Sequence, residues 1–127
     1  MKIEHIAFPV QEPVAVARWY VEHLGMRIVR ETGAPTYTHF LADESGRVFE
    51  IYNNSKVAVP DYFAMDPLLL HLAFVVEDMD AEQTRLVSAG ASIVEPPTAM
   101  PSGDVLCMLR DPWGLALQLV KRRVAMI

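Results

Sequence analysis

The chain has 127 residues, of which 52% are hydrophobic and 21% are charged, and this composition is typical of a folded domain and excludes a disordered chain. The formal net charge is −5 and the basic residues are scattered except at 121–123, so we expect no nucleic-acid partner. Cys107 is the single cysteine, which excludes an internal disulfide, and no apolar run approaches the roughly 20 residues that cross a bilayer. We therefore expect a cytoplasmic protein that has no membrane partner.

The first half of the chain has the pattern of a strand, a helix and three further strands. Apolar residues recur at helical spacing from Val14 to Leu24. They stand between Pro13, which suits a first helical turn, and Gly25, a common C-terminal cap. Turn-forming residues separate the remaining apolar runs. The expected elements are a strand at 3–10, a helix from 13 to its cap at 25, and strands at 26–32, 36–42 and 47–53.

The second half has the same order of elements. A strand at 69–77 leads into a helix that begins near Asp78 or Asp80, where a carboxylate accepts hydrogen bonds from free backbone N–H groups. Gly90 ends this helix. The remaining strands are expected at 91–95, 104–110 and 115–121, and the last two are joined by the turn-forming residues Asp111, Pro112 and Gly114.

The two halves are copies of one unit. Residues 5–10 (HIAFPV) and 71–76 (HLAFVV) are identical at four of six positions, and Gly46 with Glu50 is matched by Gly114 with Gln118. Self-similarity of this kind indicates a duplicated structural unit. We predict an α+β fold of two tandem β-α-β-β-β modules, at about 1–54 and about 68–127, in a single domain that spans 1–127.

The segment at 55–67 joins the two modules. It contains Pro60 and Pro67 together with apolar side chains such as Tyr62 and Phe63. A flexible linker is usually polar or rich in Gly and Ser. We expect this segment to pack down on the modules or to cover the site.

Four polar side chains occupy matching places in the two modules. His5 and His71 stand in the first strand of each module, and Glu50 and Gln118 stand in the last strand. The strands around them are largely apolar, and a buried polar group without a partner costs roughly 1–3 kcal/mol. Two imidazoles and two side-chain oxygens form a ligand set that suits a divalent ion of zinc, nickel, cobalt, iron or manganese.

The repeat, with His5, Glu50, His71 and Gln118, resembles the vicinal oxygen chelate superfamily, the fold of glyoxalase I, methylmalonyl-CoA epimerase, extradiol dioxygenases and bleomycin resistance proteins. The resemblance covers nearly the whole chain. It implies that the two modules form a curled mixed sheet around a cleft, that the protein is a homodimer, and that the four residues bind a metal that chelates a small-molecule substrate.

The resemblance implies a lyase or isomerase that moves a proton on a small oxygenated, carbonyl-containing substrate with the help of the metal. Many members of the superfamily carry a glutamate at the position of Gln118. An amide does not accept a proton at neutral pH, so Glu50 is the expected base. The alternatives are a binding protein similar to the bleomycin resistance proteins, which sequesters its ligand without catalysis, and an extradiol-type dioxygenase, against which Gln118 counts.

Two further residues are candidates for contact with the substrate. His39 and its neighbour Tyr37 lie in a predicted strand of the first module and could line the cleft. A histidine in a strand is more commonly a structural residue. We therefore expect their contribution to be secondary to that of the four matched residues.

Overall fold

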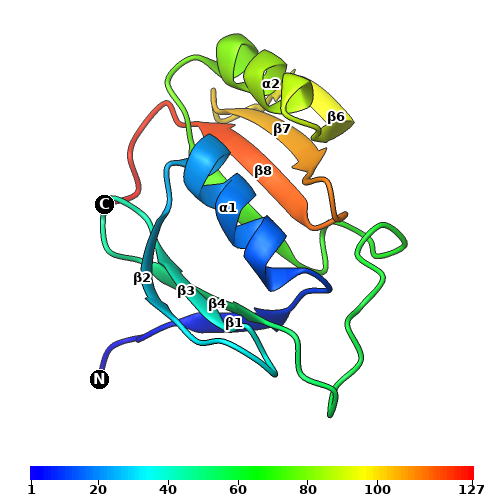
Figure 1. Cartoon of the computed structure of the whole chain (residues 1–127). Helices are drawn as coiled ribbons and strands as arrows, with labels where there is room; N and C mark the ends of the chain where they lie inside the picture. The colour runs from blue at the N-terminus through cyan, green and yellow to red at the C-terminus, as the bar shows by residue number, and fades with distance from the viewer. The chain divides into compact units, whose positions relative to one another are not determined.

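The structure is a computed structural model that describes residues 1–127, and the chain divides into two compact units, Met1–Pro60 and Asp61–Ile127. Each unit contains a strand, a helix and three further strands in that order (Figure 1). The boundary at Pro60 falls inside the segment at 55–67, so the expected connecting segment is shared between the two units.

The first unit contains one four-stranded mixed sheet in the order β1-β4-β3-β2. Strands β1 and β4 are parallel, and the other two pairs are antiparallel. The elements are β1 (Ile6–Pro9), α1 (Pro13–Leu24), β2 (Arg27–Glu31), β3 (His39–Ala42) and β4 (Val48–Tyr52).

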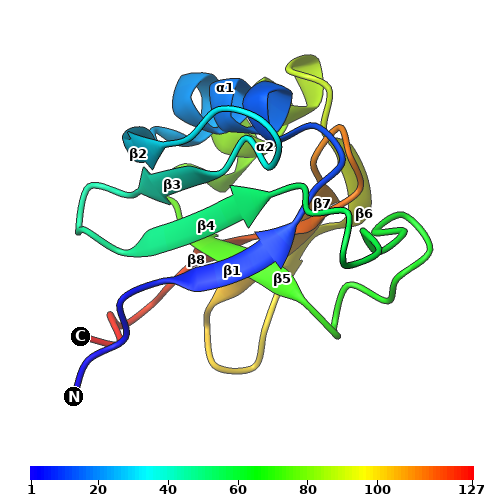
Figure 2. The same cartoon turned by 60° about the horizontal axis from the view of Figure 1, so that its bottom comes forward.

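Helix α1 lies along one face of this sheet (Figure 2). It begins at Pro13, which has no backbone N–H and therefore leaves no unpaired donor in the first turn. It ends at Gly25, whose φ of 67° is left-handed and therefore favours glycine. Tyr20 on the helix and Leu41 and Ile51 on the sheet are fully buried, so the core of the unit lies on the helix side of the sheet.

The second unit has the equivalent sheet, in the order β5-β8-β7-β6. Helix α2 begins after Asp78, whose side chain accepts a hydrogen bond from the Ala81 N–H at 3.0 Å, as expected for an N-terminal cap. The elements are β5 (His71–Val75), α2 (Met79–Ser88), β6 (Ser92–Ala99), β7 (Val105–Arg110) and β8 (Ala116–Lys121).

Four strands differ in length by three residues or more from the sequence-based expectation. Strand β3 begins at His39 instead of residue 36, and β5 spans His71–Val75 instead of 69–77. Strand β1 begins at Ile6 instead of residue 3, because Ile6 already pairs with Phe49 near the start of its parallel partner. Strand β6 extends to Ala99 although it contains Pro96 and Pro97. It is an edge strand, and its register shifts where the prolines lie, which is where a residue without an N–H is tolerated.

The turns β3–β4 and β7–β8 repeat each other in detail. The Asp43 carboxylate accepts from the Arg47 N–H at 2.8 Å, and the Asp111 carboxylate accepts from the Leu115 N–H at 3.0 Å. In each turn the glycine N–H donates to the carbonyl of the aspartate, at 3.1 Å from Gly46 and 3.0 Å from Gly114. The duplication therefore includes the turn chemistry as well as the order of elements.

The residues after Pro60 are tied to the second unit by Arg110. Its guanidinium donates to the carbonyl oxygens of Tyr62 at 2.6 Å, Met65 at 2.7 Å and Gly114 at 2.8 Å. Tyr62 is buried. The expectation that this segment packs down is met at Tyr62 and at the Met65 backbone, whereas Phe63 is 57% exposed. Neither helix of the structure has the length and apolar character needed to span a membrane.

Candidate functional site

The strand register places the four matched residues at equivalent positions of the two sheets. Glu50 lies opposite Ala7 in the parallel pair β1–β4, and Gln118 lies opposite Ala73 in the parallel pair β5–β8. Each histidine stands two residues before its alanine. His5 directly precedes β1, and its contact with Glu50 places it on the same face as Glu50.

The helix covers the other face in each unit. In the first, the buried Ile51 next to Glu50 faces α1. In the second, Leu117 and Leu119 on either side of Gln118 are buried. By strand alternation, Glu50 and Gln118 therefore lie on the sheet faces that the helices leave uncovered.

In the first unit the structure brings His5 and Glu50 together. The Nε2 atom of His5 lies 3.0 Å from Oε2 of Glu50, and the two side chains are 32% and 22% exposed. The other ring nitrogen, Nδ1, contacts the carboxylate of Glu4. This hydrogen bond is the main cause that raises the pKa of His5; partial desolvation opposes it, and the charge of Glu50 adds to it.

In the second unit the histidine has a different partner. His71 donates a hydrogen bond from Nδ1 to the Pro67 carbonyl oxygen at 2.9 Å. This bond fixes the neutral ring in the tautomer that leaves the Nε2 lone pair available, and metal-binding histidines are commonly held in this way. Gln118 is half-buried and lies opposite Met108 in the antiparallel pair β7–β8.

Each unit thus supplies one imidazole and one side-chain oxygen on the sheet face opposite its helix. Within neither unit do three or more His, Cys, Asp or Glu side chains gather as a metal-binding group. The chemistry of the donors nevertheless fits a divalent ion, because nitrogen and oxygen ligands of this kind suit several transition metals and both Nδ1 atoms are already held by oxygen acceptors.

His39, a weaker candidate for substrate contact, lies on the helix side of the first sheet. It pairs with the buried Ile51 and is itself only 5% exposed. Its Nδ1 donates to the Tyr37 carbonyl oxygen at 2.7 Å, and its Nε2 lies 3.3 Å from Oε2 of Glu31. His39 is therefore a partnered core residue on the face opposite Glu50, and its contact with substrate stays a prediction.

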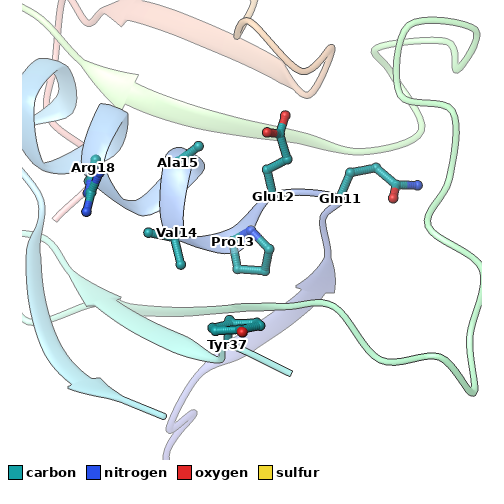
Figure 3. A pocket seen from close by; sticks show the side chains of 7 residues that line it. All are labelled: Gln11, Glu12, Pro13, Val14, Ala15, Arg18 and Tyr37. Atoms are coloured by element: carbon teal, nitrogen blue, oxygen red, sulfur yellow. The ribbon is translucent and has the colours of Figure 1, made fainter. Parts of the chain in front are cut away.

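Tyr37, the other weak candidate, lines an open groove beside the start of α1 (Figure 3). The groove has a volume of about 300 Å³. Tyr37 is 45% exposed, and its backbone φ is 45°, a left-handed value. The residues that line the groove are Gln11, Glu12, Pro13, Val14, Ala15, Arg18 and Tyr37.

Three residues around His5 and Glu50 were not predicted from the sequence. Glu4 contacts His5, the Phe40 ring meets the His5 ring edge-on at a centroid distance of 5.4 Å, and Arg30 lies 6.0 Å from the centroid of the Phe40 ring. The alternation of side chains in β3 could have placed Phe40 on the Glu50 face. No local signal could have placed Arg30 there, because its orientation depends on an irregularity in strand pairing.

Comparison with known proteins gives a family match over nearly the whole chain. The sequence model of the Glyoxalase/Bleomycin resistance protein/Dioxygenase superfamily matches residues 2–119. Among curated proteins, CFP32 of Mycobacterium bovis, which carries a provisional glyoxylase name, is 23% identical over 134 aligned positions that cover 84% of this chain. The chain spans about half the length of the curated relatives it matches, namely 51%.

Solved structures with the same fold come from bacteria and a plant. A glyoxalase family protein from Bacillus cereus has a TM-score of 0.79 at 16% identity, covering 95% of this chain and 93% of its own. One from Enterococcus faecalis has a TM-score of 0.71 at 26% identity, covering 94% and 97%. A glyoxalase I mutant from Zea mays has a TM-score of 0.75 at 23% identity, covering 95% of this chain and 45% of its own.

Proposed function

The chain belongs to the Glyoxalase/Bleomycin resistance protein/Dioxygenase superfamily, and from this premise we propose that it is a metal-dependent lyase or isomerase that moves a proton on a small carbonyl compound. Members of the superfamily typically bind a divalent metal. His5, Glu50, His71 and Gln118 are the residues that would hold it, two from each module.

The observation that carries the proposal is the contact between His5 and Glu50. Their side chains lie 3.0 Å apart on the uncovered face of the first sheet, and the second module has His71 and Gln118 at the equivalent positions. Two donors from one module are fewer than the three or four protein ligands of most transition-metal sites. Both modules must contribute if one ion is to be bound.

Glu50 is the group that takes the proton in this proposal. Its carboxylate is only partly exposed and is the only carboxylate of the four residues, while the amide of Gln118 does not accept a proton. Glu50 removes the proton from the carbon next to the carbonyl and returns it to the product. A bound divalent ion supplies Lewis-acid polarisation of the carbonyl oxygen. A positioned base contributes about 10²–10⁴-fold to the rate.

The test measures metal content together with proton exchange. Purified protein is supplied with zinc, nickel, cobalt, iron or manganese, analysed for bound metal, and incubated with hydroxyacetone in D₂O, where ¹H NMR follows exchange of the hydrogens next to the carbonyl. The expected result is stoichiometric metal and metal-dependent exchange that Glu50→Gln slows by about 10²–10⁴-fold.

A matched control is Glu44→Gln, which removes a carboxylate from the exposed turn before β4 and should leave exchange intact. Equal exchange by the wild type and Glu50→Gln would exclude Glu50 as the base. Absence of metal and of exchange under every condition would overturn the enzyme proposal.

A second candidate function is ligand sequestration without metal, and Gln118 favours it because a neutral amide is a weaker metal ligand than a carboxylate. Tight binding of a ligand by the metal-free protein, unchanged by Glu50→Gln, would support this alternative. An extradiol dioxygenase is less favoured than either candidate, because those enzymes use a glutamate where this chain has Gln118. Activity that does not depend on oxygen would exclude this third function. The homodimer is also a proposal, and sedimentation at micromolar concentration tests it.

A further inference from the structure

Strand β2 contains a bulge that changes which side chains face the candidate site. Ile28 pairs with Leu41 and Arg30 pairs with Phe40, so the register shifts between them and Val29 is the extra residue. In a regular pairing Val29 would lie opposite Phe40 and Arg30 opposite His39, on the helix side. The bulge therefore turns Arg30 to the uncovered face, and bulges next to functional sites commonly re-aim a side chain in this way.

The next pair of residues holds this register in place. Glu31 lies opposite His39, and its Oε2 is 3.3 Å from Nε2 of that histidine. His39 is buried and is fixed at its other nitrogen by the Tyr37 carbonyl oxygen. A shift of β2 by one residue would separate Glu31 from His39. The contact with the buried histidine therefore favours the register in which Arg30 lies on the same sheet face as Phe40 and Glu50.

Arg30 then completes a row of side chains across three strands. Its guanidinium carbon is 6.0 Å from the centroid of the Phe40 ring, and Phe40 lies directly opposite Glu50. Adjacent strands are roughly 4.8 Å apart, so the backbones of Arg30 and Glu50 are separated by about 10 Å. Neither Arg30 nor Arg27 of the same strand forms an ion pair, whereas Arg47, Arg85 and Arg122 each pair with a carboxylate.

We propose that Arg30 binds a carboxylate of the substrate, which makes the substrate an oxo acid whose reacting carbon lies at Glu50; this inference rests on the proposed function. A guanidinium binds a carboxylate through two parallel hydrogen bonds and matches its single charge. A phosphate monoester carries up to two charges and would need a second cation. The aromatic ring beneath the guanidinium holds it in position without neutralising its charge.

The test compares oxo acids with their methyl esters in the deuterium-exchange assay. The probes are 2-oxobutanoate, 4-oxopentanoate and 6-oxoheptanoate, which differ in the distance from carbonyl to carboxylate, and each methyl ester. The wild type should prefer at least one acid over its ester by about 10- to 100-fold in kcat/KM, the range expected for a hydrogen bond to a charged group. Arg30→Gln should bring that ratio close to one.

Arg27→Gln is the matched control, because Arg27 lies in the same strand and on the same sheet face, opposite Ala42, which is two residues along β3 from Phe40. It removes the same charge and should preserve the preference for the acid. Arg30→Lys keeps the charge without the two-pronged donor and should retain part of the preference. Equal ratios in the wild type and Arg30→Gln, or an equal loss in Arg27→Gln, would overturn the role of Arg30.

A binding measurement separates this inference from the proposed function. The metal-free protein is titrated with 4-oxopentanoate while NMR follows the Nε–H signal of the Arg30 side chain. The expected result is a saturable shift of that signal that is absent with the methyl ester. If no probe shows exchange but the shift is seen, the proposed function fails and Arg30 remains a carboxylate site; if exchange occurs without any shift, the assignment of Arg30 fails alone.

Discussion

The two modules have the same backbone arrangement around different side-chain chemistry. In the first, His5 contacts the carboxylate of Glu50 at 3.0 Å. In the second, His71 donates to the Pro67 carbonyl oxygen at 2.9 Å, and an amide, Gln118, stands where the carboxylate would be. The two modules therefore place potential ligands at equivalent positions, but only the first module has a carboxylate there.

Moving the carboxylate from one module to the other gives the largest expected effect. Glu50→Gln alone should slow metal-dependent exchange by about 10²–10⁴-fold. The double variant Glu50→Gln, Gln118→Glu should recover a large part of that loss, because the two positions are equivalent in register. Exchange in D₂O measures both. A double variant as slow as the single one would show that the two positions are not interchangeable.

Truncation of the matched core residues tests whether the modules are equally important for stability. Ile51 and Leu119 follow Glu50 and Gln118 directly, and both are fully buried. Ile51→Ala and Leu119→Ala should each lower the free energy of unfolding by about 2–5 kcal/mol. Urea denaturation measures this. If the protein shows two separate unfolding transitions, and each variant shifts only one of them, the two units unfold independently.

The glycines of the two repeated turns should differ in their tolerance of a side chain. Gly46 has a φ of 84° with open space around it, so Gly46→Ala costs only backbone strain, about 1–2 kcal/mol. Gly114 has a φ of 96°, and an added Cβ would lie 2.7 Å from the Phe63 backbone nitrogen. Gly114→Ala should cost about 2–4 kcal/mol. Thermal unfolding measures which of the two variants is less stable. An equal loss of stability in both would show that Phe63 moves away from the added Cβ without cost.

The smallest expected effect is a pH dependence at the first turn. Partial burial raises the pKa of Asp43, but hydrogen bonds from Ser45 and the Arg47 N–H outweigh it, so the pKa lies below its usual value of 3.8. Asp43 therefore stabilises the fold above pH 3.8, and this contribution is lost as the pH falls through the folded pKa. Asp43→Asn should flatten the acid limb of stability measured by denaturation between about pH 2 and 5. An unchanged acid limb would contradict this assignment.

Much of the fold could be predicted because its signals are local. Helical spacing and caps predicted α1, and the Asp78 cap predicted the start of α2. The repeat predicted that Glu50 and Gln118 are equivalent, and the register bears this out. The lengths of β1 and β6 were less accurate, because a strand ends where its partner ends or where an edge strand tolerates proline.

The sequence by itself determined the duplicated order of elements, the turn chemistry and the four matched polar positions, since each follows from residue type and spacing along the chain. Only the tertiary structure decided which face each side chain takes. His39 is buried under α1, and the bulge at Val29 turns Arg30 toward Phe40 and Glu50. A one-residue shift in strand pairing reverses the face of every later side chain in the strand, and the pairing is settled by contacts between strands that are distant along the chain.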